Sequence, residues 1–272
     1  MMDDQELVDA LDEVWSSIGD VGDGLSESEW KAPTEVPGWS VQDNLSHIVG
    51  MEARLLGRDE PAHDVPADLP HVRNEVGAGN EVAVDARRAR SGAEVLAEFR
   101  DVTGERLAQL RAAGPDDFGA ESWTPVGPGT VRDLLPFRIF DSWVHEQDMR
   151  RAVGREGHLD GPVAEAALER TIGAVPFVVG KKAAAPDGST VVVELSGPLA
   201  RSFGVGVEGG RARLLDDVPA SPTTRIVTDS PTFERLGTGR VDPATALRDG
   251  RVTVEGDDAL GQKVVTSLNF LF

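Results

Sequence analysis

The spacing of apolar residues changes once along this 272-residue chain, near residue 155. Before that point apolar side chains recur at intervals of three and four, which is the period of amphipathic helices. Beyond it, short β-branched runs alternate with helical segments. A chain of this length holds one large domain or two ordinary ones. We therefore expect a helical domain over residues 1–155 and an α+β domain over residues 161–272, joined by a glycine-rich, charged segment.

The first domain is predicted to contain long helices with recognisable start signals. Ser40, Ser91 and Thr130 each precede an acidic residue by three positions, which is typical of a capping box. Turn-rich connections favour an up-and-down four-helix bundle, although crossover connections would satisfy the same pattern. The stretch 61–79, rich in Pro, Asp, Gly and His, is expected to be a long irregular loop. The predicted helices cover about residues 3–18, 40–55, 91–113 and 130–153.

The second domain is predicted to mix helices with a small sheet. The order of its elements indicates an α+β fold whose sheet is largely antiparallel. Strands are expected near residues 190–195, 203–207, 211–214, 224–228 and 251–255, and helices near 163–180, 230–236 and 257–268.

Composition excludes several classes of function. The 27 basic residues against 47 acidic residues give a net charge of −20, so binding to a nucleic-acid backbone would meet strong repulsion. The absence of cysteine excludes disulfides, zinc-thiolate sites and a cysteine nucleophile, so any thiol chemistry must use an external sulfur. The acidic N-terminus lacks the features of a secretory signal, and no apolar stretch approaches the ~18 residues that span a bilayer. We expect a soluble, cytoplasmic protein with no membrane partner.

One segment of the last bundle helix predicts a metal site. Asp141 and His145 stand four positions apart, so their Cβ atoms lie roughly 5–6 Å from each other on one face. That stripe also carries Phe140, so the pair points into the bundle, where a buried charge requires a partner. His47, at the edge of the second helix's inner face, is the available third ligand, and Asp148 is placed to accept an imidazole N–H.

Two imidazoles and one carboxylate suit Zn²⁺ with an open coordination position, and the same ligand types serve Fe(II), Mn(II) or Ni(II). From spacing alone, a structural ion pair between Asp141 and His145 is the alternative. Trp39 and Trp143 flank these residues in sequence and are expected to anchor the core.

Two segments carry a family resemblance, residues 33–47 (PTEVPGWSVQDNLSH) and residues 141–148 (DSWVHEQD). With them the chain resembles the mycothiol-dependent maleylpyruvate isomerase family, specifically in the N-terminal half and loosely after Gly161. The resemblance implies a DinB-like four-helix metal-binding domain followed by a smaller, sterol-carrier-like α/β domain. By motif it also implies that the three candidate ligands bind zinc. The family pattern has Glu where this chain has Asp141, which leaves the metal and the substrate open.

The resemblance implies a reaction as well. In these isomerases the mycothiol thiolate adds to the cis double bond of maleylpyruvate, the resulting single bond rotates, and the thiolate leaves. We therefore expect a zinc-dependent, mycothiol-using isomerase or S-transferase acting on a small electrophile such as a carboxylate. The family uses a C-terminal-domain arginine near the substrate, and the segment 238–240 resembles it, so Arg240 is the catalytic candidate; a solvated turn residue is its alternative reading.

Two other functions remain open at this point. In a metal-dependent hydrolase, water would occupy the open metal position. In a non-catalytic module, the metal would be structural and the second domain would hold an apolar ligand such as a lipid. Architecture alone does not choose among these functions.

Overall fold

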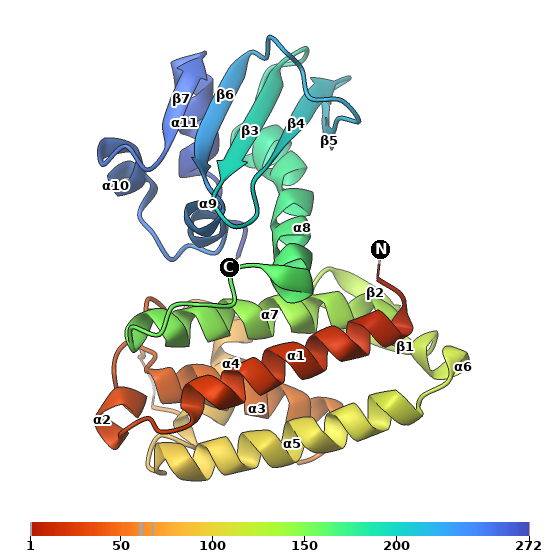
Figure 1. The fold of residues 1–272 in the computed structure, drawn as a ribbon, viewed down its shortest axis with the longest axis vertical. Helices are drawn as coiled ribbons and strands as arrows, with labels where there is room; N and C mark the ends of the chain where they lie inside the picture. The colour runs from red at the N-terminus through yellow and green to blue at the C-terminus, as the bar shows by residue number, and fades with distance from the viewer. Residues whose placement is uncertain (1, 60–61, 67, 272) are drawn as a thin grey trace. The chain divides into compact units, whose positions relative to one another are not determined.

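The computed structural model describes residues 2–59, 62–66 and 68–271, which divide into two compact units on either side of the bond between His158 and Leu159. The first unit is a helical bundle and the second is a smaller α+β unit, so the predicted fold class is confirmed (Figure 1). Among the described residues, none of the helices combines the length and the apolar character that crossing a membrane requires.

Long helices with capped N-termini build the first unit. The bundle helices are α1 (Asp4–Gly22), α3 (Val41–Leu55), α5 (Gly92–Ala112) and α7 (Val131–Ala152). Ser40, Ser91 and Thr130 form the capping boxes that the sequence predicts for α3, α5 and α7. α1 continues four residues beyond its predicted end because Val21 extends its buried face.

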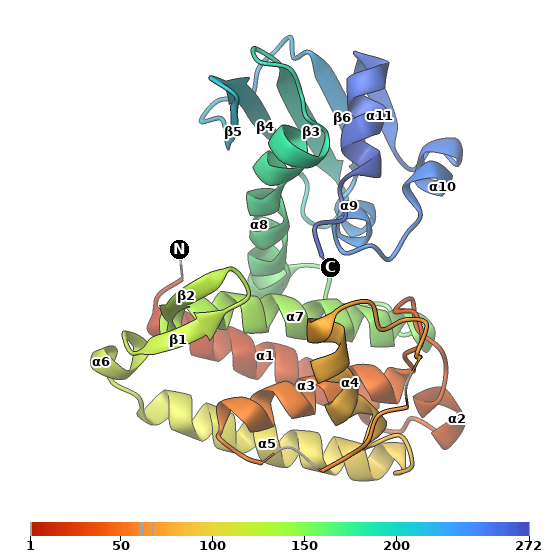
Figure 2. The same cartoon turned by 180° about the vertical axis from the view of Figure 1, so that it is seen from behind.

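The connections between these helices cross the bundle, so the up-and-down order is wrong and the crossover alternative holds. α1 packs against α5 and α7, and α3 packs against the same two helices, which places α1 diagonally opposite α3 (Figure 2). Trp15 Nε1 donates to Ser142 Oγ at 3.0 Å, and Ser17 Oγ donates to Glu146 at 2.5 Å, so α1 and α7 run parallel. As a result α3 lies directly beside α7.

Short elements provide the long connections. They are α2 (Glu27–Trp30), α4 (Glu75–Asp85), α6 (Pro115–Phe118), β1 (Glu121–Thr124) and β2 (Gly127–Thr130). α4 begins inside the stretch 61–79, so the expectation of a loop there is wrong for residues 75–79; residues 61 and 67 lie outside the described residues. Asn74 caps this helix through Gly77 N, and Gly50 of α3 lets Ala83 approach closely.

The second unit is a mixed sheet with helices. Its strands are β3 (Thr190–Ser196), β4 (Arg201–Glu208), β5 (Arg211–Leu214), β6 (Thr224–Asp229) and β7 (Thr253–Gly256). Its helices are α8 (Gly161–Phe177), the π-helix η1 (Val178–Lys182), α9 (Ser230–Gly237), α10 (Pro243–Arg248) and α11 (Asp258–Thr266). In the strand order β5-β4-β3-β6-β7, β3 and β6 are parallel and the other neighbours are antiparallel, which confirms the predicted largely antiparallel sheet. α10 went unpredicted because six residues are too few to show a period.

Candidate metal centre

The three predicted ligand side chains meet between α3 and α7. His47 comes from α3, and Asp141 and His145 come from α7, with one ligand atom of each within 4.8 Å of the others. Nε2 of His47 lies 3.2 Å from Asp141 Oδ2, and Nε2 of His145 lies 3.7 Å from Asp141 Oδ1. Within the described part of the chain, no second group of three His or acidic side chains converges in this way.

Burial and charge set the protonation of this centre. Both imidazoles are buried, whereas the Asp141 side chain is 29% exposed, so the centre opens to solvent beside the carboxylate. Burial lowers the pKa of His47, although Asp141 opposes the shift. Burial alone would raise the pKa of Asp141, but its interactions with His47 and with the Arg138 guanidinium outweigh burial and hold that pKa well below its usual range. A neutral imidazole and an ionised carboxylate are the forms that bind metal ions.

Asn44 fixes the tautomer of His145. Its side-chain nitrogen donates to Ser40 O at 2.9 Å and to Thr34 Oγ1 at 3.1 Å, so its oxygen is left as the acceptor. That oxygen lies 2.6 Å from His145 Nδ1, whereas Asp148, the predicted acceptor, lies 3.4 Å away. Nδ1 therefore carries the proton, and the Nε2 lone pair faces the centre. Asn44 stands three residues before His47 on the same helix, and this spacing is the sequence signal that points to it.

A buried ion pair holds Asp141. Arg138 Nη1 donates to Asp141 Oδ2 at 2.9 Å, and Arg138 Nε donates to Glu52 Oε1 at 2.7 Å. Burial lowers the pKa of Arg138, but Glu52 and Asp141 together outweigh it and raise the pKa above its usual value. This pairing leaves Oδ1 of Asp141 turned toward His145. An arginine three residues before Asp141, on a buried stripe, was the available sequence signal for it.

The two tryptophans near the ligands have different surroundings. Trp143 is buried and donates to His158 O at 2.9 Å, consistent with a core anchor. Trp39 is half-buried, and its ring centroid lies 5.3 Å from that of His47 and 5.7 Å from that of His145. For Trp39 the expectation of a core anchor is wrong, because the turn that precedes α3 places its indole against the centre.

Arg240 belongs to the second unit, in the segment after α9. It is half-buried, and its Nη1 donates to Thr238 O at 2.6 Å. Its backbone N–H donates to Arg235 O at 2.7 Å, which closes the turn at the end of the helix. A role toward a substrate stays a prediction for this residue.

Two family models match the chain. The model described as the mycothiol maleylpyruvate isomerase N-terminal domain covers residues 11–150, and the model of the C-terminal domain covers residues 165–263. Two uncharacterized proteins of Mycobacterium tuberculosis, from strains CDC 1551 / Oshkosh and ATCC 25618 / H37Rv, are each 26% identical over 131 residues. The match covers 48% of this chain and 49% of each relative, so it spans about half the length of these curated proteins.

Solved structures share the fold. The crystal structure of a mycothiol-dependent maleylpyruvate isomerase superposes with a TM-score of 0.57 at 12% identity, covering 88% of this chain and 90% of that one. A histidine-to-alanine mutant of the mycothiol-dependent maleylpyruvate isomerase gives a TM-score of 0.60 at 13% identity, covering 93% of both chains.

Proposed function

Because the chain belongs to the mycothiol maleylpyruvate isomerase family, we propose that it is an enzyme that uses mycothiol to isomerise a small electrophile of the maleylpyruvate kind. The observation that carries the proposal is the convergence of His47, Asp141 and His145 between two helices. In this proposal the helical domain, residues 1–155, holds the metal centre, and residues 161–272 form the second domain.

The donor set fits a divalent cation. His47, Asp141 and His145 would hold it, and two imidazole nitrogens with one carboxylate oxygen favour Zn²⁺. When bound, the cation favours the thiolate form of a thiol and so provides the nucleophile that a chain without cysteine lacks. The chain's own residues prepare the site: Asn44 keeps the proton of His145 on Nδ1, and Arg138 holds Asp141 by one oxygen.

The proposed reaction needs a reversible addition. The thiolate sulfur forms a bond to one alkene carbon, the remaining single bond rotates, and the sulfur leaves with its electron pair, so no atom is gained or lost. A substrate that kept the sulfur would instead give S-transfer. We assign Arg240 to a substrate carboxylate, because a guanidinium can bind both carboxylate oxygens.

The test is an assay of metal-loaded protein with maleylpyruvate and generic electrophiles, with and without mycothiol. We expect turnover only when mycothiol is present. The His47→Ala, His145→Ala double variant should lose both bound metal and turnover. Turnover without thiol would favour the hydrolase, and equal metal content in the double variant would overturn the proposed site.

A further inference from the structure

The two imidazoles of the centre differ in what orients them. Nδ1 of His145 contacts Asn44, which is not a proposed ligand. Among the described residues, the hydrogen bonds of His47 run from Nε2 to the two oxygens of Asp141, at 3.2 and 3.4 Å. Metal-bound histidines usually use the second ring nitrogen to fix the ring. In the part of the chain that the structure describes, His47 has no such bond outside the ligand set, so its ring depends on packing for its orientation.

The indole of Trp39 packs against the His47 ring. The ring of Trp39 is tilted by 41° to that of His47 at a centroid separation of 5.3 Å, and it also contacts His145. The His145 ring lies 4.9 Å from that of His47 and is itself held by Asn44. The three rings are therefore mutually adjacent, and the His47 ring packs against both the indole and an imidazole that a hydrogen bond fixes.

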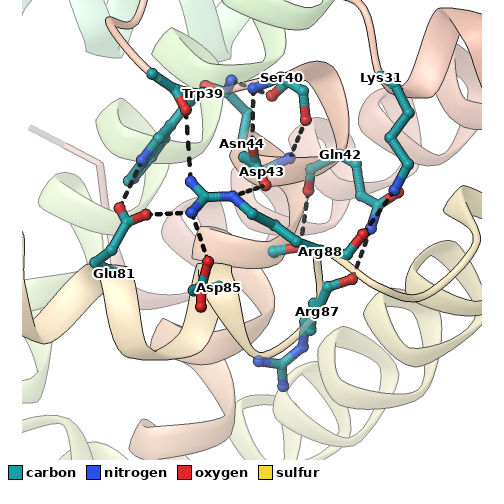
Figure 3. Close-up of polar contacts among 12 residues, drawn as sticks. Lys31, Trp39, Ser40, Gln42, Asp43, Asn44, Glu81, Asp85, Arg87 and Arg88 are labelled. Atoms are coloured by element: carbon teal, nitrogen blue, oxygen red, sulfur yellow. Dashed lines mark hydrogen bonds and ion pairs between the residues drawn. The ribbon is translucent and has the colours of Figure 1, made fainter. Parts of the chain in front are cut away.

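The indole is in turn held from α4. Trp39 Nε1 donates to Glu81 Oε2 at 3.0 Å (Figure 3). Glu81 is 1% exposed, and its oxygens lie 2.7 Å from Arg88 Nη1 and 3.1 Å from His71 Nε2. The Trp39 backbone is fixed as well, since its carbonyl accepts the N–H of Thr34 at 3.0 Å. Both the ring and the backbone of Trp39 are therefore held.

We propose that Trp39 and Glu81 are positioning residues for the metal centre. Glu81 holds the indole, and the indole holds the imidazole of His47 in the orientation that a bound cation requires. This inference rests on the metal site of the proposed function. It gives α4 a role in that site, because Glu81 acts on His47 through Trp39.

The first test measures Zn²⁺ affinity of the full chain by chelator competition, together with the absorption spectrum of the Co²⁺ form. Trp39→Leu should weaken Zn²⁺ binding about 10–100-fold, the range for residues that orient ligands, and shift the Co²⁺ bands. Trp39→Phe keeps a ring without the N–H, so its Zn²⁺ affinity should lie between that of Trp39→Leu and that of the unmodified chain. Zn²⁺ affinity of Trp39→Leu within about twofold of the unmodified chain, with unchanged Co²⁺ bands, would overturn the proposal.

Variants of Glu81 separate the hydrogen bond from general stability. Glu81→Ala should weaken Zn²⁺ binding, whereas Glu81→Gln, which retains an acceptor for Trp39 Nε1, should restore it. Glu98→Ala is the matched control, because Glu98 pairs with Arg87 and Arg90 near α4 and has no contact with Trp39 among the described residues. Equal weakening by Glu81→Ala and Glu98→Ala would contradict the proposal.

A metal-free measurement distinguishes failure of this inference from failure of the proposed function. In protein with ¹³Cε1-labelled histidine, the His47 signal is the one that His47→Gln removes. Trp39→Leu and Glu81→Ala should shift that signal, and Glu98→Ala should leave it in place. If the unmodified chain binds no divalent cation, the proposed function fails. If the His47 signal is unmoved in both Trp39→Leu and Glu81→Ala, the positioning role is overturned whatever the outcome for the proposed function.

Discussion

Asp141 and Glu146 lie on the same helix, and the two carboxylates differ in how their oxygens are occupied. Glu146 is fully buried; its Oε1 accepts from Ser17 Oγ at 2.5 Å and from Arg150 Nε at 2.7 Å, and its Oε2 lies 2.7 Å from His158 Nδ1. Both oxygens are therefore supplied with donors. Asp141 instead has one arginine on Oδ2 and the nitrogens of two imidazoles nearby.

This difference distinguishes the ion cluster at Glu146 from the proposed metal centre at Asp141. A buried carboxylate surrounded by donors contributes to stability when its partners are present, and removing one partner is costly. Asp141 faces two imidazole nitrogens that can bind a cation once they carry no proton, and with them it forms the proposed metal centre. Glu234, in the second unit, is a third case, because Thr171 Oγ1 donates to it at 2.7 Å and its other oxygen has no hydrogen-bond partner among the described residues.

The largest expected effect is on the free energy of unfolding and concerns Glu234. Burial raises the pKa of Glu234 from 4.5 to about 8, so the folded chain keeps a proton that the unfolded chain loses across that interval. The free energy of unfolding should therefore fall as pH rises from 4.5 to 8, by up to about 5 kcal/mol. Glu234→Gln should remove this dependence.

Urea unfolding across this pH range measures the effect of Glu234. All five tryptophans precede residue 158, so a circular-dichroism transition that tryptophan fluorescence misses reports the second unit. An undiminished slope in the Glu234→Gln variant would show that some other group is responsible.

Glu146→Ala tests the carboxylate whose two oxygens both have hydrogen-bond donors. Removing it leaves the Arg150 and His158 groups without their buried acceptor, so the free energy of unfolding should fall by about 3–5 kcal/mol. Chelator competition should give the Zn²⁺ affinity of the unmodified chain. A large loss of affinity would erase the proposed distinction between the two carboxylates.

His47→Gln should have the opposite pair of effects, a large loss of Zn²⁺ affinity and a small change in the free energy of unfolding. Removing a ligand should lower Zn²⁺ affinity by more than about 100-fold, beyond the loss for residues that only orient ligands. The glutamine amide is similar in size and can donate to Asp141, so unfolding in excess chelator should change by less than about 1.5 kcal/mol. Isothermal titration and urea unfolding on the same samples decide this prediction; retained affinity would exclude His47 as a ligand.

The smallest expected effect concerns His158. Its hydrogen bond to Glu146 raises the pKa of this imidazole above 6.5, although burial opposes the shift. The ion pair between His158 and Glu146 therefore stabilises the fold fully below pH 6.5. This stabilisation is lost as the pH rises through the raised pKa of His158. We expect a loss of about 1 kcal/mol. In His158→Asn this loss of stability should disappear. Thermal unfolding between pH 5.5 and 8.5 measures it. A variant that still lost stability over this range would contradict the assignment to His158.

Local signals in the sequence predict much of the fold and the centre. The capping pairs of α3, α5 and α7 lie three residues apart, and Asp141 and His145 lie four apart, so both patterns are readable along one helix. The packing of Trp39 and Glu81 is not readable in this way, because it joins residues 42 positions apart across a connection without periodicity. The sequence pattern also does not decide which connections cross the bundle, because apolar faces do not specify which helices are neighbours.

The adjacency of α3 and α7 has a consequence during synthesis. His47 and Asp141 are 94 residues apart, so a nascent chain displays one histidine of the set long before the other two ligands leave the ribosome. An early cation would meet an isolated imidazole, and firm capture must wait until the last bundle helix has docked. In this protein, loading with metal would therefore mark the completion of the first domain.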